Sequence, residues 1–229
     1  MVRDEEGRKG PADRKPGAGP QKRKQKQAGQ PPSIDPVGSL FGRSFNAAAG
    51  SLSQLTGREM LISFKDVKQF SSGDELVRHC VTKHDEAYFG SLIKVKSGLS
   101  ANIVFLIADA DGLGLYDLLN GQPVGTTKEA GDDVTVAMGE INNILSASFV
   151  NNIAALTGTE IHPSTPFNSH DMLEALMEGV VMQDDIAGQK VFCADTVIAE
   201  KNKKEFHARL LIIADREGLI RLIHPVKAA

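Results

Sequence analysis

Cysteine is scarce in this chain, and it has no long apolar run. The 229 residues contain only two cysteines, Cys80 and Cys193, too few for a disulfide framework. Their neighbours show no metal-ligand spacing, so we interpret both as small buried apolar residues. The longest apolar runs, ANIVFLIADA and ARLLIIAD, are too short to cross a membrane and are typical of buried strands. Since the first residues are polar and carry no apolar signal segment, the sequence predicts a cytoplasmic protein without a membrane span.

Charge is unevenly distributed along the chain. Residues 1–30 carry nine Lys or Arg and four Asp or Glu, whereas the remainder carries 17 basic and 25 acidic side chains. The first segment is rich in Gly, Pro, Gln and Lys, so we predict a disordered basic tail over residues 1–32. This tail is either a solvated tether or a contact, through KRKQK, for an acidic partner or an anionic surface. The acidic remainder argues against a nucleic-acid-binding domain.

Two sequence patterns recur at nearly the same offset. Leu-Thr-Gly-x-Glu occurs at Leu55–Glu59 and again 101 residues later at Leu156–Glu160. Ala-Asp-x-x-Gly-Leu begins at Ala108 and again 106 residues later at Ala214. Such echoes indicate an internal duplication. We therefore predict one domain over residues 33–229, built from repeats at about 36–121 and 133–226 that are related by a pseudo-twofold axis.

Each repeat contains two segments with the character of paired strands. EAYFGSLIKVK precedes NIVFLIAD, and QKVFCADTVIAEK precedes FHARLLIIAD, with a polar turn between the members of each pair. β-Branched and aromatic residues favour strands at these places. The predicted fold class is α+β, an antiparallel sheet flanked by helices.

A long amphipathic helix is predicted from about Asp133 to Leu156. Apolar residues recur at three- and four-residue steps and define its buried stripe: Ile141, Ile144, Leu145, Phe149, Ile153 and Leu156. At about 100° per residue, Glu140 and Asn143 lie about 60° apart and one turn along the helix. Ala147 and Asn151 fall within about 20° of Glu140 in the same projection, as does Asp133. The opposite face therefore presents a carboxylate and a carboxamide beside small residues.

The first repeat lacks this polar pair. Under the 101-residue offset, Ser39 stands where the second repeat has Glu140, and Gly42 stands where it has Asn143. Loss of chemistry from one copy is the simplest account, although an ordinary surface difference would look the same.

Glu140, Asn143, twenty-two intervening residues and Pro166 form a pattern that resembles the signature of the CheC/CheX/FliY family of chemotaxis phosphatases. The similarity extends over about Ser33 to Val226, including the duplication and the helix that leads into Leu-Thr-Gly. The family pattern also has Asp or Ser four residues before the Glu. This chain has Val136 there, a departure that bears on catalytic efficiency more than on fold.

The resemblance implies removal of the phosphoryl group from the aspartate of a CheY-like response regulator. Asn143 would position the attacking water and Glu140 would pair with the regulator's lysine, while Ala147 and Asn151 would contact the regulator. Pro166 would have a structural role, shaping the loop beyond the strand that follows the helix. The protein would need no cofactor or metal of its own, because the regulator supplies Mg²⁺. A CheD-like deamidase, which partners some relatives, is a second possible partner.

Other candidate sites have simpler interpretations. DADG, from Asp109, lacks the later ligands of a calcium loop and is interpreted as a strand-to-helix turn with an N-cap. HCVTKHDE, around Cys80, is interpreted as a surface segment rather than a metal site, since no spaced second pair follows. The contiguous Ser169-His170-Asp171 does not have the spatial arrangement of a hydrolase triad.

A function of another class remains open beside the phosphatase. The middle domain of the flagellar switch protein FliM resembles the same fold and serves structure and docking. The Glu-x-x-Asn pair and Pro166 favour the enzyme, whereas Val136 and the degenerate first repeat favour a non-catalytic interaction module. FliM's acidic CheY-capturing peptide is not evident in the basic tail.

Overall fold

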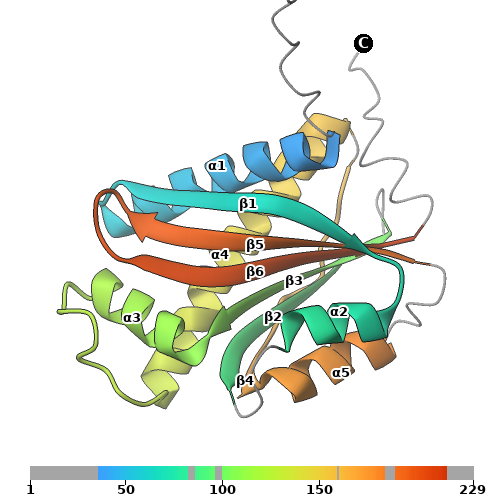
Figure 1. Cartoon of the computed structure of the whole chain (residues 1–229). Coiled ribbons are helices and arrows are strands. Elements are labelled where there is room, and N and C mark those ends of the chain that lie inside the picture. Colours follow the sequence, from blue (N-terminus) through green and yellow to red (C-terminus); the bar gives the residue numbers. More distant parts are fainter. Residues whose placement is uncertain (1–35, 82–85, 96–99, 159, 184–188, 216–229) are drawn as a thin grey trace, which may run out of the picture. The chain divides into compact units, whose positions relative to one another are not determined.

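One antiparallel sheet separates two layers of helices in the computed structural model of this chain (Figure 1). The structure describes residues 36–81, 86–95, 100–158, 160–183 and 189–215. The predicted tail and the second Ala-Asp-x-x-Gly-Leu helix lie outside these residues. In chain order the elements are α1 (Pro36–Thr56), β1 (Met60–Phe70), α2 (Gly73–Cys80), β2 (Ala87–Val95), β3 (Ala101–Ala108), α3 (Asp109–Leu119), α4 (Asp132–Thr157), β4 (Phe167–Met172), α5 (Leu173–Gln183), β5 (Lys190–Glu200) and β6 (Glu205–Ala214).

The strand order shows the duplication directly. The six strands run β1-β5-β6-β3-β2-β4. Exchanging each first-repeat strand with its second-repeat counterpart, β1 with β4, β2 with β5 and β3 with β6, reverses this order and leaves it otherwise unchanged. Every neighbouring pair is antiparallel. The predicted pseudo-twofold α+β fold is therefore confirmed.

The symmetry axis passes through the centre of the sheet, between β3 and β6. There Val104 pairs with Leu211 and Phe105 pairs with Leu210. β3 is almost entirely buried, and β6 is buried from Leu210 to Ala214, as expected for apolar runs covered on two faces. The two repeats consequently share one sheet and cannot fold as independent domains.

Alternating residues of the central strands face two separate clusters of buried side chains. Ile103, Phe105 and Ile107 belong to the larger cluster, which they form with α1 and α4. Val104 and Leu106 belong to the smaller one, with α2 and α5. The period-two alternation of a strand explains this division. Helices α1 and α4 thus cover one face of the sheet, and α2 and α5 cover the other.

Two sequence interpretations need correction at this level. Asp109 is the first residue of α3 rather than its N-cap, because Ala108 takes the cap position without a side-chain hydrogen bond. HCVTKHDE is not wholly a surface segment, since His79 and Cys80 end α2 and Cys80 is fully buried. The interpretation of both cysteines as buried apolar residues is confirmed.

Among the described residues, no helix combines the length and apolar character needed to span a bilayer.

Candidate functional site

The candidate site lies on α4, whose two ends follow from its sequence. Asp132 and Asp133 stand in the first turn, where negative charge stabilises the helix dipole. The helix stops at Gly158, which has a φ of 63° and whose N–H reaches the carbonyl of Ala154. Glycine adopts this left-handed conformation without steric cost. The prediction of a helix from about Asp133 to Leu156 is confirmed.

The predicted apolar stripe of α4 packs into the larger cluster. Ile141, Leu145, Phe149 and Ile153 are buried, while Ile144 is only partly buried and Leu156 packs partly buried at the edge of the cluster. Packing in this direction fixes the rotation of the helix about its axis. The opposite side, which carries the candidate site, therefore faces solvent.

Glu140 is exposed on this outer face, and Asn143 is half-buried one turn further on. Side chains three residues apart on a helix have Cβ atoms about 5–6 Å apart. None of the hydrogen bonds or ion pairs in the described part of the chain involves either side chain. The pair is thus held rigidly by the backbone while both functional groups are available to a partner.

The neighbouring positions on this face hold one small, one apolar and two polar residues. Asn151 is exposed and Ala147 is half-buried, while Val136 has 74% of its surface exposed. Asp133, the carboxylate nearest in projection, accepts a hydrogen bond from the Tyr116 hydroxyl at 2.8 Å. That bond lowers the pKa of Asp133 and ties it to α3. Asp133 is therefore already engaged and does not replace the acidic group missing at Val136.

Pro166 lies immediately before β4, which corrects the prediction that it shapes a loop beyond the following strand. In the first repeat β1 begins at Met60, soon after Gly57, whereas β4 begins only at Phe167. Proline has no N–H to donate to a sheet and is tolerated at the start of an edge strand. Pro163 makes an isolated bridge to Val95, so this segment still follows the edge of β2.

Edge strand β4 approaches α4 beside the candidate pair. A Cβ atom built on Gly139 would lie 3.0 Å from Nδ2 of Asn168. The glycine next to Glu140 thus allows the amide of Asn168 to rest against the helix backbone. Because β4 begins directly after Pro166, this contact connects Pro166 to the helix that carries Glu140 and Asn143.

Helix α1 packs beside α4, beyond the candidate pair. Ser51 and Ser148 share a hydrogen bond of 2.8 Å, and Asn152 donates to the Ser44 hydroxyl at 2.9 Å. Phe149 packs edge-on against Phe41, with ring centroids 5.5 Å apart. These contacts couple the two repeats and leave the N-terminal half of the outer face of α4 open.

A curated relative resembles this chain along most of its length. Over 194 residues it is 23% identical to a protein of Bacillus subtilis named CheY-P phosphatase CheC, covering 81% of this chain and 88% of the relative. A comparison with protein-family profiles gives no match.

Solved structures share the fold at lower identity. FliY of Thermotoga maritima superposes with a TM-score of 0.64 at 16% identity, covering 85% of this chain and 96% of FliY. The FliM middle domain from H. pylori gives 0.57 at 12% identity, covering 82% and 94% of the two chains. The chain resembles the CheC/CheX/FliY family.

One buried side chain beside the Glu140–Asn143 pair was not singled out from the sequence of this CheC-like chain. Asn142, next to Asn143, is only 1% exposed and faces inward. Its Oδ1 atom, like the hydroxyl of Ser146 one turn later, has no hydrogen-bond partner in the described part of the chain. The register of the apolar stripe would have placed Asn142 on the buried side. Of these two adjacent asparagines, Asn143 therefore faces the solvent side and Asn142 faces the core.

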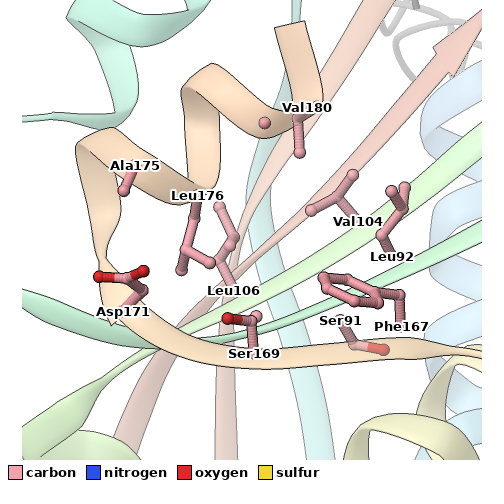
Figure 2. A pocket seen from close by; sticks show the side chains of 12 residues that line it. Ser91, Leu92, Val104, Leu106, Phe167, Ser169, Asp171, Ala175, Leu176 and Val180 are labelled. Atoms are coloured by element: carbon pink, nitrogen blue, oxygen red, sulfur yellow. The ribbon is translucent and has the colours of Figure 1, made fainter. Parts of the chain in front are cut away.

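An apolar pocket of about 140 Å³ lies on the other face of this CheC-like fold, between α5 and strands β2, β3 and β4 (Figure 2). Figure 2 shows Phe167 of β4 beside Leu92 and Val104, with Leu176 and Val180 of α5 opposite. Neither Glu140 nor Asn143 lines it. The candidate site is thus an open helix face rather than a pocket.

Two groups that were not interpreted as sites from the sequence, Ser169-His170-Asp171 and the segment around His79, have different outcomes in the structure. His170 turns away from Ser169 and contacts Asp109 of α3 at 2.8 Å, so Ser169-His170-Asp171 forms no triad, as predicted. His79, in contrast, is brought to Cys193 and Asp195 of β5, with their potential ligand atoms within 4.8 Å of one another. No ligand spacing in the sequence indicates this cluster, because its members come together only through the packing of α2 against β5.

Proposed function

We propose that this chain accelerates dephosphorylation of the phosphoaspartate of a CheY-like response regulator. The observation that carries the proposal is the unengaged Glu140–Asn143 pair on the outer face of α4. It is supported by the similarity to a curated CheY-P phosphatase across most of the chain. The position of Pro166, separated from Asn143 by twenty-two residues, is consistent with it.

Asn143 would act by positioning water. An acyl phosphate hydrolyses without a catalyst, and the Mg²⁺ bound by the regulator neutralises the phosphoryl oxygens. A carboxamide oxygen accepts a hydrogen bond from the attacking water, and its NH₂ group donates to a neighbouring acceptor. Placing this amide on a rigid helix supplies orientation without requiring a titrating base.

Glu140 would dock the regulator by pairing with its active-site lysine. Ala147 and Asn151 continue the same face and are either small or exposed, so a partner can approach α4 closely along this line. A CheD-like deamidase is a second partner compatible with the proposal.

A non-catalytic docking module is the alternative. Val136 is exposed at the position where the family pattern has Asp or Ser, and an exposed valine suits a contact surface. The fold is also shared with the FliM middle domain. In this alternative the face of α4 binds a receiver without altering its phosphorylation.

The decay rate of a phosphorylated CheY-like receiver from the same cell, measured with Mg²⁺, separates these functions. The native chain should accelerate decay, and Asn143→Ala should lose about 10²-fold of the acceleration because it removes the ordering group. Asn46→Ala, which removes an exposed amide from α1, serves as the matched control and should leave the rate unchanged. Binding of cognate receivers without acceleration of any would support the docking module instead.

A further inference from the structure

A polar cluster on the other side of the sheet is left unused by the proposed phosphatase. His79 lies in the last turn of α2, and Cys193 and Asp195 lie on the same side of β5. One ligand atom from each lies within 4.8 Å of the other two. We propose that His79, Cys193 and Asp195 bind a zinc ion that links α2 to β5.

The imidazole and the carboxylate already stand at the spacing of zinc ligands. Nε2 of His79 is 3.5 Å from Oδ2 of Asp195. Zinc bonds of about 2.0–2.3 Å in tetrahedral geometry place ligand atoms about 3.4–3.6 Å apart. The Cys193 sulfur lies within 4.8 Å of both other ligand atoms and would need to come closer to share the ion. A mixed set of nitrogen, sulfur and oxygen atoms suits zinc better than magnesium or calcium.

The surroundings of His79 suit it to act as a zinc ligand. Metals bind the neutral imidazole through one ring nitrogen. The Nε2 atom of His79 is buried without a hydrogen-bond partner in the described part of the chain. The ring packs on Phe70, with centroids 5.0 Å apart. An unsatisfied buried nitrogen is costly, and a bound cation would satisfy it.

Asp195 is held with one oxygen facing His79. Nε of Arg209 donates to Oδ1 at 3.0 Å, and the same guanidinium donates through Nη1 to the Cys80 carbonyl at 2.7 Å. Within the described residues, the contacts of Oδ2 are longer, 3.5 Å to His79 and 3.6 Å to the exposed Lys68. Arg209 would therefore orient the ligand from outside the metal site, as partners of metal ligands commonly do. Lys68 would move aside.

Cys193 would supply the thiolate. Cys193 is buried on β5, and a metal binds the deprotonated sulfur, so metal binding must displace a proton. The ion can enter from a cavity of about 520 Å³ lined by Asp195, Lys68 and Arg209. Water in this cavity would complete the fourth position.

The test uses the full chain, without an affinity tag and freed of metal by a chelator. Titration with Zn²⁺ alone should give one ion per chain and raise the unfolding temperature. Co²⁺ in place of Zn²⁺ should give thiolate-to-metal charge-transfer absorption. His79→Gln, Asp195→Asn and Cys193→Ser should each weaken zinc binding about tenfold or more, and Cys193→Ser should abolish the absorption.

Matched controls make the result decisive. His162→Gln removes an exposed histidine and should change nothing, and Cys80→Ser should retain the cobalt absorption. If Cys193→Ser fails to fold by circular dichroism, the partly exposed His79 and Asp195 variants decide the matter. No stoichiometric zinc binding, or binding that these variants leave intact, overturns the proposal. Since the readout is metal binding, this result is independent of phosphatase activity.

Discussion

Helices α1 and α4 are counterparts in the two repeats, yet they agree on one side and differ on the other. Both end on a glycine of positive φ, 64° at Gly57 and 63° at Gly158. Both bury an apolar face against the same sheet. On the outer face α1 has Ser39 and Gly42 where α4 has Glu140 and Asn143. Each copy keeps a buried face and a C-terminal glycine because folding needs them, whereas the two outer faces carry different groups.

The buried faces also differ in how they fill space. α1 contributes Phe41 and Phe45, while the corresponding residues of α4 are Asn142 and Ser146. Phe149 of α4 packs against both phenylalanines. The two halves of the duplicated core are therefore filled by different side chains. The polar substitutions lie on the helix that carries the candidate site.

The largest expected effect on stability concerns the loop that leads into α4. Asp117 is fully buried, and its carboxylate accepts from the backbone N–H groups of Gly125, Thr126 and Thr127 and from the Thr127 hydroxyl. Asp117→Asn should lower the free energy of unfolding by about 2–3 kcal/mol, because an amide nitrogen cannot accept these bonds. Denaturant titration measures this, and Glu129→Gln, an exposed carboxylate in the same loop, should have little effect.

The stability difference between wild type and Asp117→Asn should depend on pH. Burial opposes ionisation of Asp117, but hydrogen bonds from Thr127, Gly125 and Thr126 outweigh it and lower its pKa. A lowered folded-state pKa gives stability above the unfolded value of about 3.9, which is lost as pH falls through the folded value. The difference between wild type and Asp117→Asn should thus be constant near neutral pH and shrink below about pH 4. A constant difference down to low pH would contradict this assignment.

A second prediction isolates the charge on the outer face of α4. Glu140→Gln should raise the Kd for the receiver about tenfold, or about 1.4 kcal/mol, because it removes the partner of a lysine. The loss should shrink as salt is added. Glu178→Gln, on the exposed side of α5, is the control. Equal losses in both variants would mean that overall charge, rather than this face, attracts the receiver.

The two capping glycines should respond alike. Gly57→Ala and Gly158→Ala each place a Cβ in the left-handed region and should each cost about 1 kcal/mol of unfolding free energy. Thermal or denaturant unfolding would show it. A cost at one site and none at the other would show that the repeats do not use their Leu-Thr-Gly turns equivalently.

The smallest expected change in stability comes from alanine substitutions at Gly38 and at Gly139, its counterpart in the second repeat. Alanine at Gly38 meets nothing within 4 Å and should stabilise α1 by roughly 0.5–1 kcal/mol. Alanine at Gly139 comes within 3.0 Å of the Asn168 amide, so that gain should be cancelled. An equal gain at both positions would mean that β4 gives way easily beside Glu140.

Much of the candidate site was predictable because its geometry is local. The apolar period fixed both the extent of α4 and the face on which Glu140 and Asn143 lie. Pro166 was misplaced because strand pairing, not the local sequence, determines where β4 begins. The inward turn of Asn142 could have been inferred from the stripe. The engagement of Asp133 by Tyr116 could not, since it depends on how α3 packs.

By itself, the sequence determined the duplication, the α+β class and a long helix with a polar pair on its outer face, because helical period and repeat spacing are properties of neighbouring residues. Only the tertiary structure decided that β3 and β6 meet at the centre of one shared sheet. It alone brought Asn168 against Gly139 and His79 to Cys193 and Asp195. Contacts between residues distant in sequence depend on how the whole core packs, which no local pattern specifies.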